Sequence, residues 1–247
     1  MFQKALAAAA LVAALITALL ALAPGPLYAA GWVNLGDAFT LFLDHAPRAA
    51  TATAVLAALG VAVAVWQRGW RAAGIGVLSG LIAAGVWYAV TDFRSRAAAH
   101  PLHDVTTDPE NPPGFQSIEP RRYASGSGAA TAAFPHPRWR AVHAEIYSDI
   151  RPLTLSGSLP EIVERSVMLG EAMGWTILAE EISDGTARIE ASTRTDWFGF
   201  TDDIALRFRE TDGGLVRIDM RSVSRIGVSD IGKNAERLRL FAEAMME

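Results

Sequence analysis

Arginine recurs at alternate positions in the segments near the C-terminus that have the pattern of β-strands. These residues are Arg188, Arg207, Arg209, Arg217 and Arg221, and only Glu190 and Asp219 share their faces as acids. Guanidinium groups bind carboxylates and phosphates through paired hydrogen bonds. If the strands are neighbours, this face can bind an anionic ligand or a lipid headgroup. The alternative is a solvated sheet face with weak ion pairs.

The segment after the last strand can extend this candidate ligand site. Arg225 and the backbone amides near 229–232 can lie close to the arginine face and bind the same anion. The residues that we assign to the site are Arg207, Arg217, Arg221, Arg225, Ser229 and Asn234.

Carboxylates and histidines form a second set of residues that can do chemistry. Asp196, Asp202 and Asp203 flank an aromatic segment, but the region 147–247 contains no histidine to act as a base. A hydrolase site would require the His100–Asp108 arm to fold over these carboxylates. Adjacent residues of a strand point to opposite faces, so Asp202 and Asp203 favour a role at a strand end. We therefore assign no catalytic residue and favour a non-enzymatic protein.

Metal, cofactor and nucleic-acid sites find little support in the composition. The chain has 247 residues and no cysteine, which excludes disulfides and cysteine-based metal sites. His100, His103, Asp104 and Asp108 resemble part of a metal site, but no second pair of ligands follows, so turn-forming polar residues are preferred. A net charge of -4 without Lys/Arg-rich runs argues against nucleic-acid binding. We expect no metal and no cofactor.

Three aromatic residues, Trp197, Phe198 and Phe200, surround Gly199. They form either an exposed knob for a membrane or a protein partner, or part of the core with Gly199 as a bend; core is the commoner case. The residues assigned as candidate arm or partner contacts are His103, Asp104, Asp108, Trp197, Phe198 and Phe200. A third alternative is therefore a structural or assembly factor that acts through this loop or through the membrane spans.

Long apolar segments dominate the first part of the chain. The sequence is 51% apolar and has a mean hydropathy of +0.22 although 19% of it is charged. Three uncharged stretches, 5–23, 49–66 and 72–90, are each long enough for a helix to cross about 30 Å of hydrocarbon. The sequence therefore predicts a transmembrane region over 1–96 and a separate domain over 97–247.

Basic residues indicate the orientation of these spans. Lys4 precedes the first span, and Arg68 and Arg71 lie in the short link between the second and the third. The positive-inside rule places both segments in the cytoplasm, so the tail emerges outside. Residues 1–29 also resemble a signal peptide, whose cleavage would leave the tail on the same side.

Two smaller features of the membrane region also carry predictions. Apolar residues between Trp32 and Leu43 recur at helical spacing, which predicts a short helix that lies in the membrane interface or packs on the spans. Gly76 and Gly80 form a pair of small residues that lets another helix approach, more plausibly from the same chain than from a dimer partner.

An arm over 97–146 connects the spans to the compact part of the tail. Its stretch HDVTTDPENPPGF, residues 103–115, contains prolines that prevent continuous helix and polar residues that favour turns. The segment 123–137 is centred on SGSGAATAA and predicts a mobile loop.

The remainder has the pattern of an α+β unit. Ser158 and Glu161 form a capping box for a helix that ends at Gly174, and Ser229 or Asp230 can cap a last helix. Alternating apolar residues, with hairpin signals at 184–185 and 212–214, predict strands. These strands are 153–155, 175–181, 186–193, 203–210 and 216–220. We expect an antiparallel sheet with two helices on one face.

Four ordered motifs together resemble a known family. They are His103–Asp108 with Asn111, Pro112, Pro113 and Phe115; Tyr147–Leu153; Trp197–Phe200 with Asp202 and Asp203; and Arg221–Ala235. This combination is similar to the bacterial family catalogued as domain of unknown function 1499, over about 100–243.

The resemblance implies a membrane-anchored protein of the bacterial inner membrane, and the orientation of the spans makes its C-terminal domain periplasmic. It implies no activity and no catalytic residues. It also implies that 103–115 is the entry motif of the domain and lies ordered against the sheet. The expected partners are the lipid bilayer and an anionic lipid, envelope ligand or membrane protein.

Overall fold

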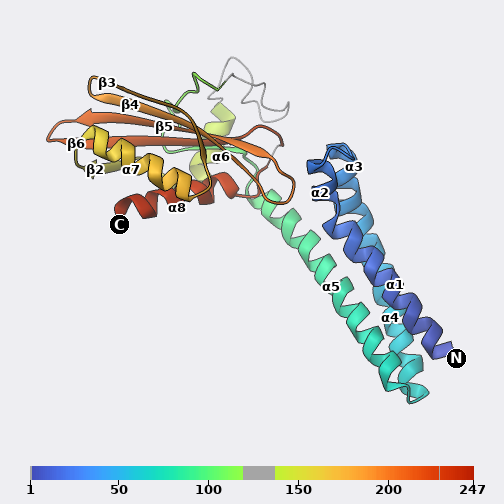
Figure 1. Cartoon of the computed structure of the whole chain (residues 1–247). Helices are drawn as coiled ribbons and strands as arrows, with labels where there is room; N and C mark the ends of the chain where they lie inside the picture. The colour runs from blue at the N-terminus through green and yellow to red at the C-terminus, as the bar shows by residue number, and fades with distance from the viewer. Residues whose placement is uncertain (1, 119–136, 228) are drawn as a thin grey trace. The chain divides into compact units, whose positions relative to one another are not determined.

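The computed structural model of the chain describes residues 2–118, 137–227 and 229–247. It forms two compact units (Figure 1). The helical unit comprises Met1–Ser95 and Asp196–Gly199, and the sheet unit comprises Arg96–Thr195 and Phe200–Glu247. The loop predicted from SGSGAATAA lies outside the described residues.

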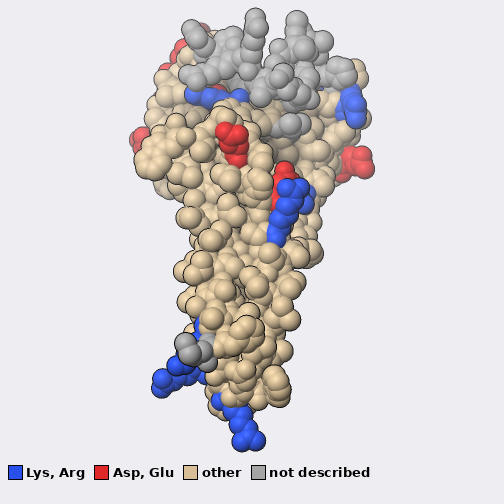
Figure 2. Space-filling model, turned by 90° about the vertical axis from the view of Figure 1, so that its right-hand side faces the viewer, with Lys and Arg blue, Asp and Glu red and all other residues tan. Residues whose placement is uncertain are grey.

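Three long helices form most of the helical unit. They are α1 (Phe2–Leu22), α4 (Ala46–Trp66) and α5 (Trp70–Ala99). Each belongs to a helical segment that is long and apolar enough to cross a membrane, with mean hydropathies of 2.6, 2.0 and 1.8. Figure 2 shows a band without charged side chains along these helices, with only Lys and Arg as charged side chains at its lower end and side chains of both signs above it. The three predicted spans are therefore confirmed as candidate membrane helices.

Small residues let the long helices of this unit approach closely. A Cβ added to Gly76 would lie 2.7 Å from Val61 Cγ2 and 3.2 Å from the carbonyl oxygen of Ala57. The predicted close approach at Gly76 is thus made by α4 of the same chain. Helices α1 and α4 also share a buried hydrogen bond, because the hydroxyls of Thr17 and Thr53 are 2.9 Å apart.

Short helices connect α1 to α4. They are α2 (Pro24–Ala29), α3 (Leu35–Phe39) and the π-helix η1 (Thr40–His45), which runs directly into α4. Phe42 is buried against α5 residues, whereas Trp32 is exposed. Of the two arrangements predicted for 32–43, packing on the spans therefore applies to Phe42.

An antiparallel sheet with six strands forms the centre of the sheet unit. The strands are β1 (Asp104–Thr106), β2 (Leu153–Ser156), β3 (Thr176–Ser183), β4 (Thr186–Arg194), β5 (Thr201–Thr211) and β6 (Leu215–Ser224). Their order is β1-β6-β5-β4-β3, and β2 also pairs with β6. Apolar residues alternate along the strands, so Ile204, Leu206 and Phe208 enter the core from one face of β5.

Helices α7 (Leu159–Ala172) and α8 (Lys233–Met246) lie on the core face of the sheet (Figure 1). The capping box at Ser158 and Glu161 is present, and Gly174 follows α7 with a φ of +79°. At α8 the carboxylate of Asp230 accepts hydrogen bonds from the backbone amides of Gly232 and Asn234. The predicted α+β fold, with its hairpins and two helices, is confirmed.

The arm contains more regular structure than its composition indicates. Strand β1 pairs with β6, and helix α6 (Pro137–Ile146) packs beside it, since the Trp139 indole donates to the Asp104 carbonyl. The His143 imidazole nitrogen Nε2 accepts a hydrogen bond from the Thr106 amide. The prediction that the entry motif is ordered against the sheet is therefore confirmed.

Candidate functional site

The arginines predicted to share one surface lie on the sheet face opposite α7 and α8, here called the polar face. Its residues are Arg188 and Glu190 on β4, Arg207 and Arg209 on β5, and Arg217, Asp219 and Arg221 on β6. The register places Arg207 between Arg188 and Asp219, and Arg209 opposite Arg217. The adjacency of these strands thus brings the predicted side chains together.

A single buried carboxylate holds three of these arginines. Asp219 is bonded by Arg207 at 2.9 Å, by Arg209 at 2.6 Å and by Arg217 at 2.9 Å. Burial alone would raise the pKa of Asp219, but the hydrogen bonds from Arg217 and Arg207 outweigh burial and lower it. The acid is therefore ionised, and it lies beneath the guanidinium groups that it binds.

The arm crosses the polar face and binds several of its charges. Arg221 forms a two-point ion pair with Asp104, at 2.9 and 2.7 Å, and donates to the Pro113 carbonyl. Arg207 donates to Asp108 at 3.1 Å and to the Asn111 carbonyl at 2.9 Å. These contacts hold residues 108–113, which follow β1 and form no strand, against the polar face.

Glu190 fixes the end of the described arm. Its buried carboxylate accepts hydrogen bonds from three consecutive backbone amides, those of Gln116, Ser117 and Ile118, at 2.7, 2.9 and 2.8 Å. Arg188 approaches the same carboxylate at 3.2 Å and binds Glu181 at 2.7 Å. A carboxylate that receives several backbone N–H groups is a strong anchor for a loop.

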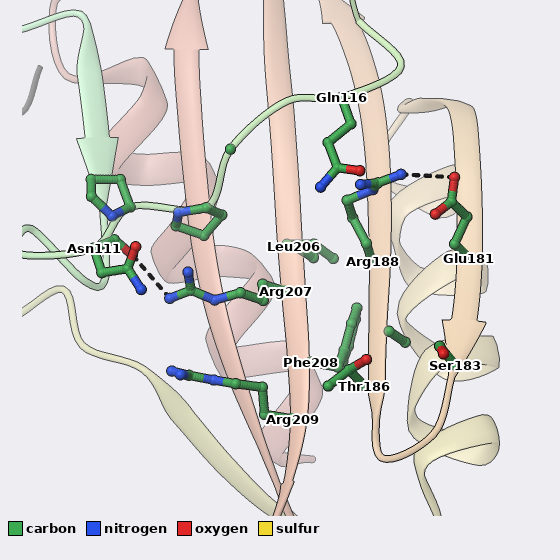
Figure 3. Close-up of a pocket in the computed structure, with 14 residues that line it drawn as sticks. Asn111, Gln116, Glu181, Ser183, Thr186, Arg188, Leu206, Arg207, Phe208 and Arg209 are labelled. Atoms are coloured by element: carbon green, nitrogen blue, oxygen red, sulfur yellow. Dashed lines mark hydrogen bonds and ion pairs between the residues drawn. The ribbon is translucent and has the colours of Figure 1, made fainter.

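A groove of about 570 Å³ lies between this arm and strands β3 to β5. The arm contributes 111–114 and Gln116, and the strands contribute Arg188, Arg207, Arg209 and Glu181 (Figure 3). The side chain of Arg209 is 39% exposed, whereas that of Asp219 beneath it is 0% exposed. The groove is lined by three arginines and by one acid, Glu181, whose side chain is 63% exposed, and the polar face as a whole contains five arginines and two acids.

Several residues assigned to the ligand site from sequence are engaged inside the fold instead. Arg221 is buried with Asp104, and Arg225 forms a two-point ion pair with Asp203 at 2.9 and 2.7 Å. Ser229 donates its hydroxyl to the His100 carbonyl. Of the six assigned residues, Arg207 lines the groove. Arg217 does not line it, but binds Asp219, the carboxylate that also binds Arg207.

Asn234 belongs to a buried polar network on the α8 side of the sheet. Its amide nitrogen donates to the His103 carbonyl and to the Ser224 hydroxyl, and its oxygen accepts from the Ser222 hydroxyl and from Arg237. These bonds join α8, β6 and the arm, so Asn234 has a structural role in the described fold.

The carboxylates of the hydrolase hypothesis are held by arginines on opposite faces of β5. Asp202 binds Arg237 of α8 at 2.8 Å, and Asp203 binds Arg225. His103 is close enough to Asp202 to feel its charge, but burial is the larger influence and lowers the pKa of His103. Its Nδ1 is 3.0 Å from the Ser224 carbonyl. The imidazole and both carboxylates are buried, so the arrangement offers no open acid–base pair among the described residues.

The aromatic segment divides between the two units. Trp197 and Phe198 belong to the helical unit, where Trp197 packs edge-on against Phe42 at 4.8 Å and its indole donates to the Leu22 carbonyl. That carbonyl is free because the residue four positions later is Pro26, which has no amide hydrogen. Phe198 is buried. The core interpretation therefore holds for Phe198, and Phe200 directly precedes β5 in the sheet unit.

Within the described ranges, no group of three or more His, Asp or Glu residues is arranged to hold a metal ion. Sequence reasoning placed Arg188 and Arg209 on the polar face but not in the ligand site, and it missed Gln116 and the carboxylate anchor Glu190. The alternation of arginine was the available signal for the first pair. The arm residues carried no such signal, because their contacts join segments about 70 to 120 positions apart.

Fold and site together define an α+β domain with an arginine-lined groove, preceded by helices long enough to cross a membrane. The chain belongs to the family described as Protein of unknown function (DUF1499), whose model matches residues 104–245. That match runs from the first residue of β1 into α8, so the arm is part of the family domain, and the resemblance noted in the sequence is confirmed. No match was found among curated proteins.

Proposed function

We propose that this protein is a non-enzymatic, membrane-anchored protein of the bacterial cell envelope that binds the anionic group of a ligand in the groove of its sheet unit. The observation that supports this function is the placement of charge at the groove. Guanidinium groups of Arg207 and Arg209 are accessible, while Asp219, which neutralises part of their charge, is buried below them. A carboxylate or phosphate can thus approach Arg207 and Arg209 without approaching Asp219, while the other acid of the groove, Glu181, is paired with Arg188.

Arg209 is best placed to bind such a ligand. Only its NH2 group bonds Asp219, and the other N–H groups of its guanidinium make no hydrogen bond within the described part of the chain. A guanidinium presents five donors in a planar fork that matches carboxylate and phosphate. Arg209 can therefore keep its internal ion pair and still donate to a ligand.

The groove also limits the size of the ligand. Its volume of about 570 Å³ falls in the range of small-molecule sites. The rings of Pro112 and Pro113 supply apolar surface, and the hydroxyls of Ser183 and Thr186 are further polar partners. We infer a small organic acid or phosphate ester that carries a ring or a short carbon skeleton.

The location follows from the distribution of basic residues on the helices. Lys4, Arg68 and Arg71 all lie in or beside one turn region, and the positive-inside rule assigns this region to the cytoplasm. The sheet unit then follows the third span into the periplasm, and the chain belongs to the inner membrane. Ligands of the envelope, including those of lipid origin, are the expected partners.

Two arginines with nearly equal surroundings provide the test. Arg209 and Arg217 have side chains that are 39% and 38% exposed, and both bind Asp219, but only Arg209 lines the groove. The purified full chain in detergent is titrated with glucuronate and glycerol phosphate, and with glucose and glycerol as uncharged counterparts. Binding is measured by ligand-observed NMR for the native protein, R209Q and R217Q.

We expect the charged compounds to bind and their uncharged counterparts to bind at least about tenfold more weakly. R209Q is expected to lower affinity about tenfold or more, because it removes a charged hydrogen bond, and R217Q about threefold or less. Equal binding of charged and uncharged compounds would overturn the proposal. So would an equal loss in R209Q and R217Q, which would indicate a general charge effect.

A further inference from the structure

One end of the helical unit concentrates positive charge. Lys4 lies in the first turn of α1, Arg68 lies in the link between α4 and α5, and Arg71 lies in the first turn of α5. The side chain of Gln3 contacts Gly69 in that link, since a Cβ on Gly69 would overlap it. The start of α1 therefore lies beside the link, and Lys and Arg side chains gather at this end (Figure 2).

No acid neutralises these cations within the described residues. Lys4, Arg68 and Arg71 take part in none of the ion pairs there, and the acids that come next along the chain, Asp44 in η1 and Asp92 in α5, stand 24 residues before Arg68 and 21 residues after Arg71. At 1.5 Å per residue this distance is about 30 Å, which exceeds the Debye length at physiological salt. The cluster is thus an uncompensated cationic site at one end of the spans.

Aromatic residues surround the same site. The last residue of α4, Trp66, is 84% exposed, and the first residue of α5, Trp70, is 71% exposed. Exposed tryptophan at the end of an apolar helix is typical of the level of lipid headgroups. Val65 and Val77 continue the exposed apolar surface along both helices, so acyl chains can lie directly beneath a headgroup bound here.

The backbone conformation of this link favours glycine at the position that Arg68 occupies. Arg68 has a φ of +55°, and the amides of Arg68 and Gly69 donate to the carbonyls of Val65 and Ala64. This is the Schellman arrangement, in which the left-handed position is normally glycine. The turn alone does not account for arginine at this position, whereas a requirement for a cation does.

We propose that this end of the helices, formed by Lys4, Trp66, Arg68, Trp70 and Arg71, binds the phosphate of an anionic phospholipid. The inference rests on the proposed membrane insertion of the spans but not on the groove of the sheet unit. The three cations bind the phosphate, and the tryptophans lie at the glycerol level. A lipid fits better than a free phosphate because the site opens onto apolar helix surface.

Native mass spectrometry of the full chain in detergent tests this inference. Phosphatidylglycerol and phosphatidylcholine with identical acyl chains are titrated separately. Glycerol phosphate serves as the headgroup without chains, and it is measured in R209Q, where its proposed binding in the groove is weakened. The variants are R68Q, the triple variant K4Q/R68Q/R71Q, and R48Q as a control that removes one exposed arginine at the other end of α4.

For the native protein we expect phosphatidylglycerol to bind at least about tenfold more tightly than phosphatidylcholine, and for R209Q we expect glycerol phosphate to bind more weakly than either lipid. R68Q is expected to reduce the preference about fivefold and the triple variant to abolish it, because each cation near an anionic headgroup contributes a factor of about five. R48Q is expected to retain the preference.

An equal affinity for the two lipids, or an equal loss in R48Q and R68Q, would overturn the inference. Alkaline extraction of membranes separates this failure from failure of the anchoring proposal. Release of the chain from the membrane would overturn both proposals about the spans. Retention of the chain without lipid preference would overturn only the lipid site. Tight binding of glycerol phosphate would assign the site to a soluble phosphate instead.

Discussion

Replacement of Glu190 by glutamine is expected to release the arm from the sheet. Glu190 accepts three backbone amides with two carboxylate oxygens. In the variant, one side-chain oxygen can keep the two bonds from Ser117 and Ile118. The new NH2 group then faces the amide of Gln116, so that amide loses its acceptor and meets a second donor.

The magnitude follows from these contacts. Hydrogen bonds to a charged group contribute about 1 kcal/mol more than neutral ones, and a buried amide without a partner costs about 1–3 kcal/mol. Two weakened bonds and one lost bond therefore lower the free energy of arm opening by about 3–5 kcal/mol. At 1.4 kcal/mol for each factor of ten, the amides of 116–118 are expected to exchange with solvent about 100-fold to 4000-fold faster.

Hydrogen exchange followed by mass spectrometry measures this change, with peptides of α1 as an internal reference. Glu181→Gln is the matched control, because Glu181 binds the same Arg188 at 2.7 Å but its side chain is 63% exposed. Exposed ion pairs contribute about 1 kcal/mol or less, so exchange at 116–118 is expected to change by less than about fivefold in the control. Unchanged exchange in Glu190→Gln would refute the anchoring role of this carboxylate.

Two further predictions concern the cap of α8 and the contact between α4 and α5. Burial raises the pKa of the half-buried Asp230 to about 6, so its contribution to stability is full below its ordinary value of 3.8 and is lost as the pH rises through 6. The free energy of unfolding is measured for the native protein and for Asp230→Asn by urea titration in detergent. As the pH falls from 7 to 4, the difference between the two proteins should shift by about 1–2 kcal/mol in favour of the native protein. A difference that stays constant with pH would contradict this prediction. The lowered pKa values of His103 and His143 make both proteins less stable as the pH falls, and this effect cancels in the difference between them. Gly76→Ala should lower the melting temperature, because the added Cβ would lie 2.7 Å from Val61. Gly80→Ala is the control and should melt like the native protein, because its Cβ would lie 3.7 Å from Ala57. Equal melting temperatures of all three proteins would show that α4 can move away without cost.

Local patterns predicted most of the sheet unit. Alternation of apolar residues and the turns at Gly185 and 212–214 give β3 to β6 to within a few residues, and the capping box gives the start of α7. These features depend on neighbours in sequence, so one sequence is enough to recognise them.

The arm and the detail of the site depend on contacts that no local pattern records. Asp104 and Arg221 are 117 positions apart, and Gln116 and Glu190 are 74 apart. Arginine alternation predicted a shared face, but not that Asp219 binds three guanidinium groups at once. Helix α6 was missed because its short amphipathic pattern lies within a segment dominated by proline and small residues.

The position of β6 in the sheet has a consequence for the biogenesis of the chain. Strands β1 and β2 pair with β6, and β6 is the last of the six strands of this sheet in chain order. During synthesis the spans and five of the six strands emerge before the strand that joins β1 and β2 to the rest. Their backbone groups therefore await partners until β6 has been synthesised, and the sheet closes only after all the other strands have emerged. A chain truncated before Leu215 retains its candidate membrane helices but exposes several unpaired strand edges, which makes it a substrate for proteolysis and quality control.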